Sequence, residues 1–464
     1  MSPLLTAALL ALSAGVFDVV PIPLGTPEAQ SFAVAIDNDA TLEMAVLDQH
    51  TLNIHAIDTG TLRFSVTLPE GVSAFDIFDA DGDGLAEILA VQPPRILLIE
   101  LEDEAAPREL FRDDDLLEHA GAFPVPHLLA TQRDGAWLLA IPCRAALKLW
   151  TLDGTLVDTH SLTGSGQNPA PFERPFMART VYPNLVAPPG AIELHIDQVV
   201  VHDAVPVAPS PDTGHEAMRR PGSPIELQDA EDEAFHRWPW FSLVSPENGP
   251  RRVFYALCGP EYEDTLIRVQ QAGADSGDGG GDVRVSPARR YRGCLVPPWQ
   301  TLPDFNGDGY TDILVWLSPQ PGRSIDALTR AVASRSWPLQ LLVHCFDPEK
   351  NRYDPRNAGV IDTRVPIAWF VRPEQGMPLN FSLMGDFNGD GRTDLAFATA
   401  PNTFCAWTYA NGFPRKPSFE HTFPENLLGI ESPGDIDGTG RTTAVLRTSR
   451  ALYLLRPTRA QTRE

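Results

Sequence analysis

The sequence has little positive charge for its size, and this shortage narrows the range of partners. Of its 464 residues, 36 are Lys or Arg and 61 are Asp or Glu, which gives a formal net charge of −25. Because an acidic surface repels phosphates and anionic headgroups, nucleic acid and anionic lipid are poor partners. The surplus of carboxylates suits divalent cations, and it also keeps a protein soluble without any ligand.

Cysteine is scarce as well, and its spacing argues against zinc. None of the five cysteines forms a CxxC pair or lies near a histidine at the spacing of zinc ligands. The odd number prevents complete internal pairing. One bridge, between Cys258 and Cys294, is left open by the sequence, which offers no specific support for it. Most of these cysteines end apolar runs, as Cys143 does, where a buried thiol is the usual outcome.

Long apolar runs are missing apart from a short one at the start. Residues 1–15 combine an apolar stretch with small residues, as in a signal peptide, although they lack the usual basic residue. No apolar run reaches the ~20 residues of a membrane-spanning helix. We therefore expect no transmembrane segment, a possible signal peptide and a secreted, extracellular or periplasmic protein. Residues 458–464 form a polar tail.

Helical periodicity and familiar catalytic motifs are also hard to find. The 44 Pro and 35 Gly residues are spread along the chain and predict many tight turns between short strands, hence an all-β fold. The sequence contains no GxSxG, HExxH or Walker motif, and no GxGxxG in a strand–helix context. We accordingly assign no catalytic residue and expect a non-enzymatic protein.

What the sequence does contain is a repeat. Three segments match closely, at residues 78–91, 303–316 and 385–398, and each joins a polar loop rich in Gly and Asp to an apolar strand. A fourth segment, 434–446, keeps this form but has threonine at two of the acidic positions. Self-similarity of this kind is typical of repeat architectures.

Around each loop the chain follows one order: a strand, the loop, an apolar second strand, and two further strands separated by turns. Four short strands per unit of about 40–50 residues are typical of a propeller blade. The second strands fall near residues 44, 88, 137, 198, 253, 313, 395 and 444, which predicts eight blades. Seven is the alternative, because the unit at 178–238 is poorly patterned. Residues 16–24 could complete the last unit and close the ring by pairing the N- and C-terminal strands.

The propeller is expected to form one domain over residues 16–457. Three stretches interrupt its repeat and are predicted to be surface insertions: a Pro-rich charged stretch at 205–236, a Gly-rich one at 273–282, and 318–338, with a short helix around 324–333.

The loops carry oxygen ligands at alternate positions. Calcium takes six to eight oxygens at roughly 2.3–2.6 Å, and a short segment can surround it with side chains at positions one, three, five and nine and a backbone carbonyl at seven. The glycines at positions four and six permit the curvature. The predicted ligands, with the carbonyl of the fourth residue in each set, are Asp79, Asp81, Asp83, Leu85 and Glu87; Asp304, Asn306, Asp308, Tyr310 and Asp312; and Asp386, Asn388, Asp390, Arg392 and Asp394.

The alternative is that these segments are only Asp-Gly turns. One such turn would be weak evidence, whereas three near-identical copies favour about three structural calcium ions. The loops are not EF-hands, because position twelve is Ala90, Val315 or Phe397 and a strand follows. The loop at 435, with Thr439 and Thr443, is expected to bind weakly or not at all. A further loop at 37–43 looks cropped and is expected to bind nothing.

These segments resemble FG-GAP/VCBS repeats, the blade unit of integrin α-subunit propellers and of many bacterial secreted proteins. The motif Asp-Phe-Asn-Gly-Asp-Gly-x-x-Asp followed by four apolar residues is matched at 304–316 and 386–398, and at 79–91 with Ala80 and Asp81 substituted. The resemblance implies a propeller with calcium in its loops and an extracellular setting. It covers about a third of the chain and does not fix a function.

Two functions remain open from the sequence. The first is a secreted or cell-surface scaffold, expected to be monomeric, that binds an extracellular protein or glycan, as in cell adhesion. The second is a polysaccharide lyase, because some calcium propellers similar to this one are lyases. His195 and His202 flank one apolar strand, where packing is the commoner role. The aromatic residues that could line a sugar site, or simply fill the core, are Trp238, Trp240, Phe241, Trp299, Trp316, Trp337 and Trp369.

Overall fold

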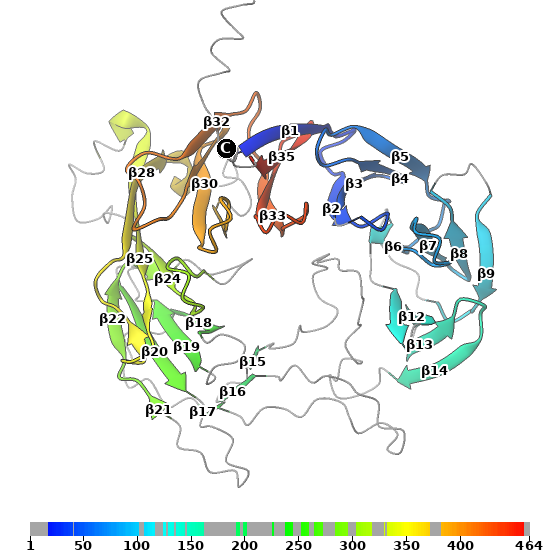
Figure 1. Cartoon of the computed structure of the whole chain (residues 1–464), viewed down its shortest axis with the longest axis horizontal. Coiled ribbons are helices and arrows are strands. Elements are labelled where there is room, and N and C mark those ends of the chain that lie inside the picture. Colours follow the sequence, from blue (N-terminus) through cyan, green and yellow to red (C-terminus); the bar gives the residue numbers. More distant parts are fainter. Residues whose placement is uncertain are drawn as a thin grey trace, which may run out of the picture. The chain divides into compact units, whose positions relative to one another are not determined.

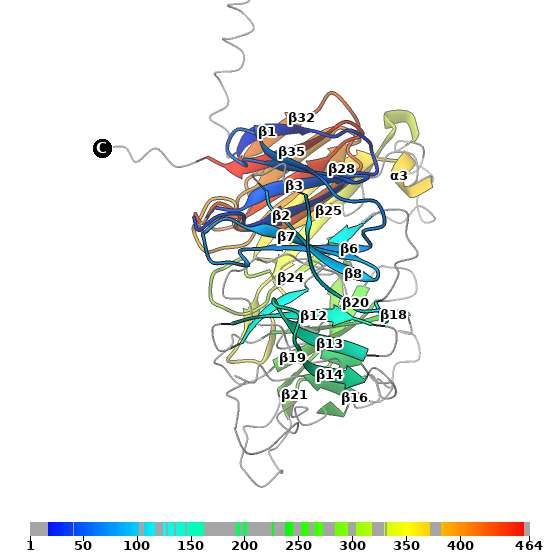
Figure 2. The same cartoon turned by 90° about the vertical axis from the view of Figure 1, so that its right-hand side faces the viewer.

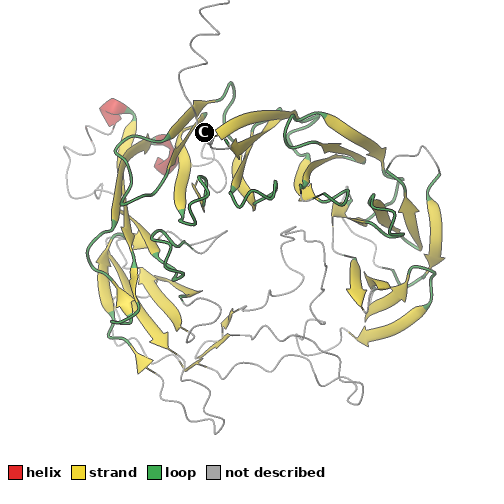
Figure 3. Ribbon diagram, in the orientation of Figure 1, coloured by secondary structure: helices red, strands yellow, loops and turns green. Residues whose placement is uncertain are grey.

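The computed structural model is all-β, with strands along the whole described chain and very few helical residues (Figure 3). It divides into two compact units. Unit 1 comprises Met1–Val19, Gln228–Asp435 and Thr439–Glu464, and unit 2 comprises Val20–Leu227 and Ile436–Gly438. The structure describes residues 17–39, 41–101, 106–116, 124–126, 129–133, 136–143, 146–161, 192–194, 198–201, 225–226, 237–244, 252–258, 264–271, 284–295, 303–317, 329, 332–371 and 382–458.

Unit 2 is a succession of mainly antiparallel sheets, each built from consecutive strands (Figure 1). The first contains β2 (Gln30–Val34), β3 (Glu43–Asp48), β4 (Thr51–His55) and β5 (Leu62–Thr67); the second contains β6 (Ala74–Phe78), β7 (Glu87–Gln92), β8 (Arg95–Ile99) and β9 (Arg108–Arg112), with β10 (Val125–Pro126) parallel to β6; the third contains β11 (Ala130–Arg133), β12 (Ala136–Pro142), β13 (Ala146–Thr151) and β14 (Leu156–Ser161); the fourth contains β15 (Ile192–Leu194), β16 (Gln198–Val201) and β17 (Ile225–Glu226).

Unit 1 repeats the arrangement, and the strand β1, which begins in this unit, lies next to β35 in its last sheet. The short helix α3 (Ala368–Val371) follows β28 directly (Figure 2). The strands are, sheet by sheet, β18 (Arg237–Leu243), β19 (Arg252–Cys258), β20 (Asp264–Gln271), β21 (Arg284–Val285) and β22 (Arg289–Arg292); β23 (Cys294–Leu295), β24 (Ile313–Leu317), β25 (Ser336–His344) and β28 (Gly359–Pro366); β26 (Phe346–Asp347) and β27 (Arg352–Tyr353); β29 (Ser382–Gly385), β30 (Asp394–Ala400), β31 (Thr403–Trp407) and β32 (Phe419–Thr422); and β33 (Gly429–Gly434), β34 (Thr443–Arg447), β35 (Ala451–Pro457) and β1 (Phe17–Pro23).

Burial explains why the second strand of each sheet is almost wholly apolar. In β7 the first five residues are buried, whereas the fourth strand of the neighbouring sheet, β5, alternates between exposed and half-buried residues. A strand covered on both faces needs side chains such as Ile88 and Leu89, each of which contributes about 1.5–3 kcal/mol on full burial. The buried strands place the loops that precede them against a rigid support.

Most predictions of strand position are confirmed. All eight expected second strands are present, from β3 to β34, and the N-terminal strand pairs with the last unit as expected. The expected insertion at 318–338 ends earlier than predicted, because β25 already begins at Ser336, where it pairs with Pro366. Residues 332–334 are helical. The predicted signal peptide, the insertion at 273–282, most of that at 205–236, and residues 459–464 lie outside the described residues.

Packing also accounts for the described tryptophans and cysteines. Trp337 and Trp369 are buried in the core of unit 1, and Trp316 packs against it. Among the other aromatic candidates, Trp299 and the side chains in 238–241 lie outside the described residues, as do His195 and His202. Cys143, Cys294 and Cys405 are buried thiols and Cys345 is half-buried. None of the described helices is long and apolar enough to cross a membrane.

Candidate metal-binding loops

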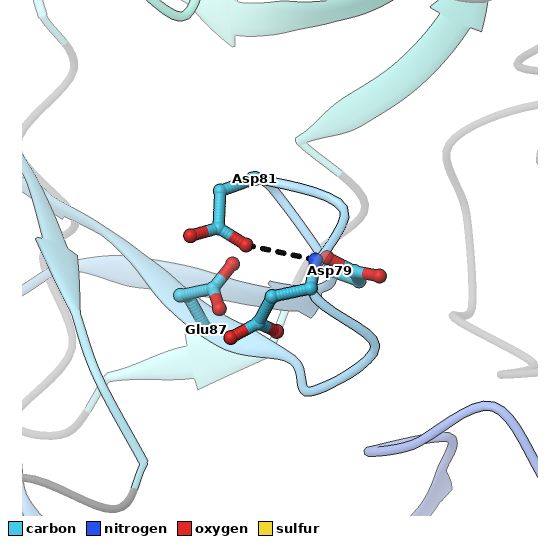
Figure 4. Close-up of side chains that lie close together, drawn as sticks. Asp79, Asp81 and Glu87 are labelled. Carbon is cyan, nitrogen blue, oxygen red and sulfur yellow. Dashed lines mark hydrogen bonds between the residues drawn. The ribbon is translucent and has the colours of Figure 1, made fainter.

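The loop 79–87 connects β6 to β7 and brings four carboxylates together (Figure 4). Ligand oxygens of Asp79, Asp81, Asp83 and Glu87 all lie within 4.8 Å of one another. Among the residues that the structure describes, no other group of three or more Asp, Glu, His or Cys side chains has its ligand atoms this close together. The structure thus brings together the four side chains that the sequence assigns as ligands, and metal binding by them stays a prediction.

Asp79, at position one, shapes the turn. Its two carboxylate oxygens accept the backbone N–H groups of Gly82 at 2.7 Å and Gly84 at 3.1 Å. Asp81 and Asp83 each accept the N–H two residues ahead, at 3.0 and 2.8 Å. Such Asx turns orient the carboxylates in succession along the loop, and a carboxylate that accepts one N–H still has lone pairs for a cation.

The loops 304–312 and 386–394 reproduce this pattern in unit 1. The carboxylate of Asp304 accepts the N–H groups of Gly307 and Gly309, both at 2.7 Å, and Asp386 accepts those of Gly389 and Gly391 at 2.6 and 2.7 Å. Position three is an amide here. Its Nδ2 donates to the carboxylate at position five, from Asn306 to Asp308 at 2.9 Å and from Asn388 to Asp390 at 3.3 Å. The amide thus lowers the local negative charge relative to loop 79–87.

Position nine is buried in all three loops and has a structural role that the sequence did not reveal. Asp394 accepts the N–H of Phe387 at 3.0 Å and that of Tyr409 at 2.6 Å, and Asp312 does the same for Phe305 and Phe346 at 2.9 and 2.8 Å. In these two loops the carboxylate therefore ties the loop to the segment just after the third strand of its sheet, whereas Glu87 accepts the N–H of Ala80 within its own loop.

Burial dominates the acidity of these position-nine groups. It raises the pKa of Glu87, of Asp312 and of Asp394 to about 7 in each case, with the backbone N–H donors opposing the shift. Burial likewise raises the pKa of Asp304 above its ordinary value. A bound cation would stabilise the charged form of such groups, because it supplies the opposite charge that the buried site lacks.

Each loop is also bonded to the preceding sheet of its own unit through position eight, a feature missed at the sequence level. In unit 1, two hydrogen bonds join Thr393 and Asp304. The backbone N–H of Asp304 donates to the hydroxyl of Thr393 at 2.7 Å, and the N–H of Thr393 donates to the carbonyl of Asp304 at 2.7 Å. The threonine at position eight of three loops was the visible signal. In each of these backbone hydrogen bonds the position-eight N–H donates to a carbonyl of the preceding sheet or loop: Thr311 to Val244, Thr393 to Asp304, Thr442 to Asp386 and, in unit 2, Ala86 to Ile36.

The loop 37–43 corrects one prediction. Val34 pairs with Glu43 just as Phe78 pairs with Glu87, so eight residues separate the paired positions in both sheets and the loop is not cropped. Ala35 therefore occupies position one. The resemblance to a shortened loop arose because the aspartate that marks position one is absent.

The predicted ligand side chains thus lie on three loops with similar turns, each just before a buried second strand. Among the described residues, only the acidic ligand atoms of loop 79–87 all lie within 4.8 Å of one another. Leu85, Tyr310 and Arg392 occupy position seven as expected, and each donates its N–H to the carboxylate at position five, at 2.8, 2.9 and 3.0 Å. Their carbonyls as ligands remain a prediction.

Comparisons with known proteins find similar solved structures but no related sequence family. No family model and no curated protein matches the sequence. Among solved structures, BBS1N in complex with ARL6DN is 9% identical, over 97% of this chain and 99% of that chain, with a TM-score of 0.32. The Nup133 β-propeller domain of Vanderwaltozyma polyspora is 8% identical, over 91% and 93%, with a TM-score of 0.29. PpgL, a periplasmic gluconolactonase of Pseudomonas aeruginosa, is 12% identical, over 93% and 100%, with a TM-score of 0.26. Likenesses this weak leave function to be argued from the chain itself.

Proposed function

We propose that this chain is an FG-GAP/VCBS-type β-propeller of eight blades that binds about three calcium ions and acts as a secreted, non-catalytic scaffold. Eight sheets of three to five strands follow one another along the described chain, and β1 joins the sheet of β33–β35. These two facts support the blade count and the closure by terminal strands. In this arrangement β1 supplies the fourth strand of the last sheet and so joins the two ends of the chain.

The convergence of four carboxylates in loop 79–87 carries the calcium part of the proposal. Like charges packed this closely repel one another, and a hard divalent cation with oxygen ligands reverses that penalty. The same Asx turns recur at 304–312 and 386–394, with an amide oxygen in place of one carboxylate, although the three carboxylates of each of these loops do not all lie within 4.8 Å of one another. Both oxygen types are good calcium ligands.

We propose a secreted or periplasmic location as part of this function, because extracellular calcium-binding modules typically bind near ~10⁻⁴–10⁻³ M. The partner would be an extracellular protein or glycan, bound by a surface that the loops help to hold rigid. The burial of Trp337 and Trp369 favours core packing over sugar binding for these two residues, and so gives no support to the alternative of a polysaccharide lyase.

The test is thermal unfolding with and without calcium. We expect EGTA to lower Tm by several degrees, and excess CaCl2, but not MgCl2 at equal ionic strength, to restore it, because ligands that bind only the folded state stabilise it by mass action. An unchanged Tm in EGTA would mean that the loops are only turns.

A single substitution locates one ion. Asp390→Ala removes the exposed carboxylate at position five, and we expect equilibrium dialysis with ⁴⁵Ca to count one ion fewer per chain while far-UV circular dichroism is preserved. Thr439→Ala, at position five of the loop 435–443, is the matched control and should leave the count unchanged. Incubation with acidic polysaccharides checks the scaffold assignment, because rising absorbance from an unsaturated product would show a lyase instead.

A further inference from the structure

Arg63 reaches from β5 into the loop 37–43 of the same sheet. Its guanidinium donates through Nη2 to Asp37 at 3.1 Å and through Nη1 to Glu43. Glu43 is 3% exposed, and burial raises its pKa to about 7 against the opposing effect of Arg63. One cationic side chain therefore bridges the two acidic ends of this loop.

The two bridged residues occupy positions three and nine. The pairing of Val34 with Glu43 places Glu43 at position nine, where loop 79–87 has Glu87, and places Asp37 where that loop has Asp81. The backbone turns agree as well. The N–H of Asp39 donates to Asp37 at 3.1 Å and that of Thr41 to Asp39 at 2.7 Å, as Asp83 and Leu85 do one sheet further on.

The charges of the two loops also correspond. Loop 79–87 has four carboxylates, at positions one, three, five and nine. Loop 37–43 has three, because Ala35 replaces the first. Arg63 is bonded to two of these three, Asp37 and Glu43, so the loop with fewer carboxylates is the one whose cation has the smaller charge.

We propose that the guanidinium of Arg63 occupies, in loop 37–43, the place that a divalent cation takes in loop 79–87. The inference rests on the proposed function for its comparison with calcium, but the role of Arg63 as the cation of its own loop does not. The first sheet of unit 2 is thereby held by a covalently attached cation and needs no metal. A guanidinium suits this place because its fixed fork bonds two carboxylates at once.

Hydrogen exchange on the unaltered protein gives the first test. We expect the amides of 37–43 to exchange equally slowly in EGTA and in CaCl2, while those of 79–87 exchange faster in EGTA. Faster amide exchange in both loops in EGTA would contradict the proposal that Arg63 is the cation of loop 37–43. Insensitivity of loop 79–87 would instead contradict the proposed calcium site.

A double-mutant cycle tests the cation without reference to calcium. Arg63→Met should lower Tm by several degrees in EGTA, because it leaves Glu43 buried beside Asp37 without its counter-charge. Adding Glu43→Gln to that variant should recover most of the loss. A double variant no more stable than Arg63→Met would overturn the proposal, since Arg63 would then act through other contacts.

Conversion of the loop tests whether the two cations share one place. The variant Ala35→Asp with Arg63→Ala restores all four acidic positions and vacates the centre, and we expect ⁴⁵Ca dialysis to count one ion more than in the unaltered protein. Ala35→Asp alone is the control and should gain none, because Arg63 still occupies the loop. Equal counts in the double variant and the unaltered protein would contradict a shared place.

Discussion

The loops 386–394 and 435–443 have similar backbone turns but different side chains. Gly385 pairs with Asp394 as Gly434 pairs with Thr443, so both loops have the same number of residues between the paired positions. Asp435 accepts the N–H groups of Thr439 at 3.1 Å and Gly440 at 2.7 Å, much as Asp386 accepts those of its own loop. The loop 435–443 has threonine at positions five and nine.

The comparison separates what the turn needs from what a cation needs. The aspartate at position one is common to both loops and satisfies the backbone. The carboxylate at position five accepts the N–H of position seven in loop 386–394, but the turn does not require its charge, since Thr439 occupies that position in loop 435–443. The charge of Asp390 is therefore the part of position five that a cation would use. Position nine differs again, because Asp394 is also a backbone acceptor whereas Thr443 has a buried hydroxyl.

The largest expected effect therefore comes from position nine. Asp394→Ala leaves the N–H groups of Phe387 and Tyr409 buried without an acceptor, and we expect the free energy of unfolding to fall by about 2–4 kcal/mol even in EGTA. Urea denaturation followed by circular dichroism measures it. Thr443→Ala is the matched control, with a loss of about 1 kcal/mol or less. Equal losses would refute a special structural role for Asp394.

The second prediction removes the difference between the loops. Thr439→Asp with Thr443→Asp gives loop 435–443 acidic groups at positions one, three, five and nine, and should create a further calcium site. At a calcium concentration near 100 times Kd, the added stability relative to EGTA is about 2.7 kcal/mol. The same substitutions to asparagine keep the size without the charge and should gain far less. Dialysis with ⁴⁵Ca that finds no added ion in the aspartate variant would show that the loop lacks something other than charge.

Sequence periodicity was sufficient to predict the sheets, because each buried second strand is a short apolar run bounded by turns. It also led to the acidic group of loop 79–87, since residues close in sequence within one turn can be close in space. Loop 79–87 shows this best, where four carboxylates spaced within nine residues converge.

Contacts between distant residues were beyond the sequence. Arg63 lies 20 residues from Glu43 and 26 from Asp37, and nothing in the local pattern marks it as their partner. The bond from Thr393 to Asp304 spans 89 residues. Loop 37–43 was misjudged as cropped because its length is defined by strand pairing, which becomes visible only when Val34 is seen opposite Glu43.

The third prediction concerns pH. The pKa values of Glu87, Asp312 and Asp394 are raised to about 7 by burial, from about 4 in an unfolded chain. The folded state therefore binds these protons more tightly, so their contribution to stability is complete below pH 4 and is lost as pH rises through 7. In EGTA we expect Tm to fall between pH 6 and pH 8 by the equivalent of roughly 1 kcal/mol for each of these three groups, and less so in CaCl2.

Asp394→Asn is the control for this titration. The amide keeps one oxygen acceptor but cannot ionise, so the variant should show a shallower fall of Tm between pH 6 and pH 8 in EGTA. The Tm of this variant at a single pH does not test the titration, because the loss of one carboxylate oxygen also removes a hydrogen-bond acceptor and lowers Tm at every pH. An unaltered slope would assign the pH dependence to other groups, such as the histidines.

The smallest effect isolates the strain of the turn itself. Gly391 and Gly440 hold position six in the two loops, with φ of 78° and 77°, and a Cβ added at either would meet nothing within 4 Å. Replacement by alanine should therefore cost about 1 kcal/mol in both loops in EGTA, through backbone strain alone. If calcium binds loop 386–394 and depends on its curvature, CaCl2 should widen the loss for Gly391→Ala and leave that for Gly440→Ala unchanged. Urea denaturation of both variants, in EGTA and in CaCl2, measures the loss in free energy of unfolding in each case. If the two variants lose equal stability in CaCl2, ion binding does not depend on the curvature of the loop.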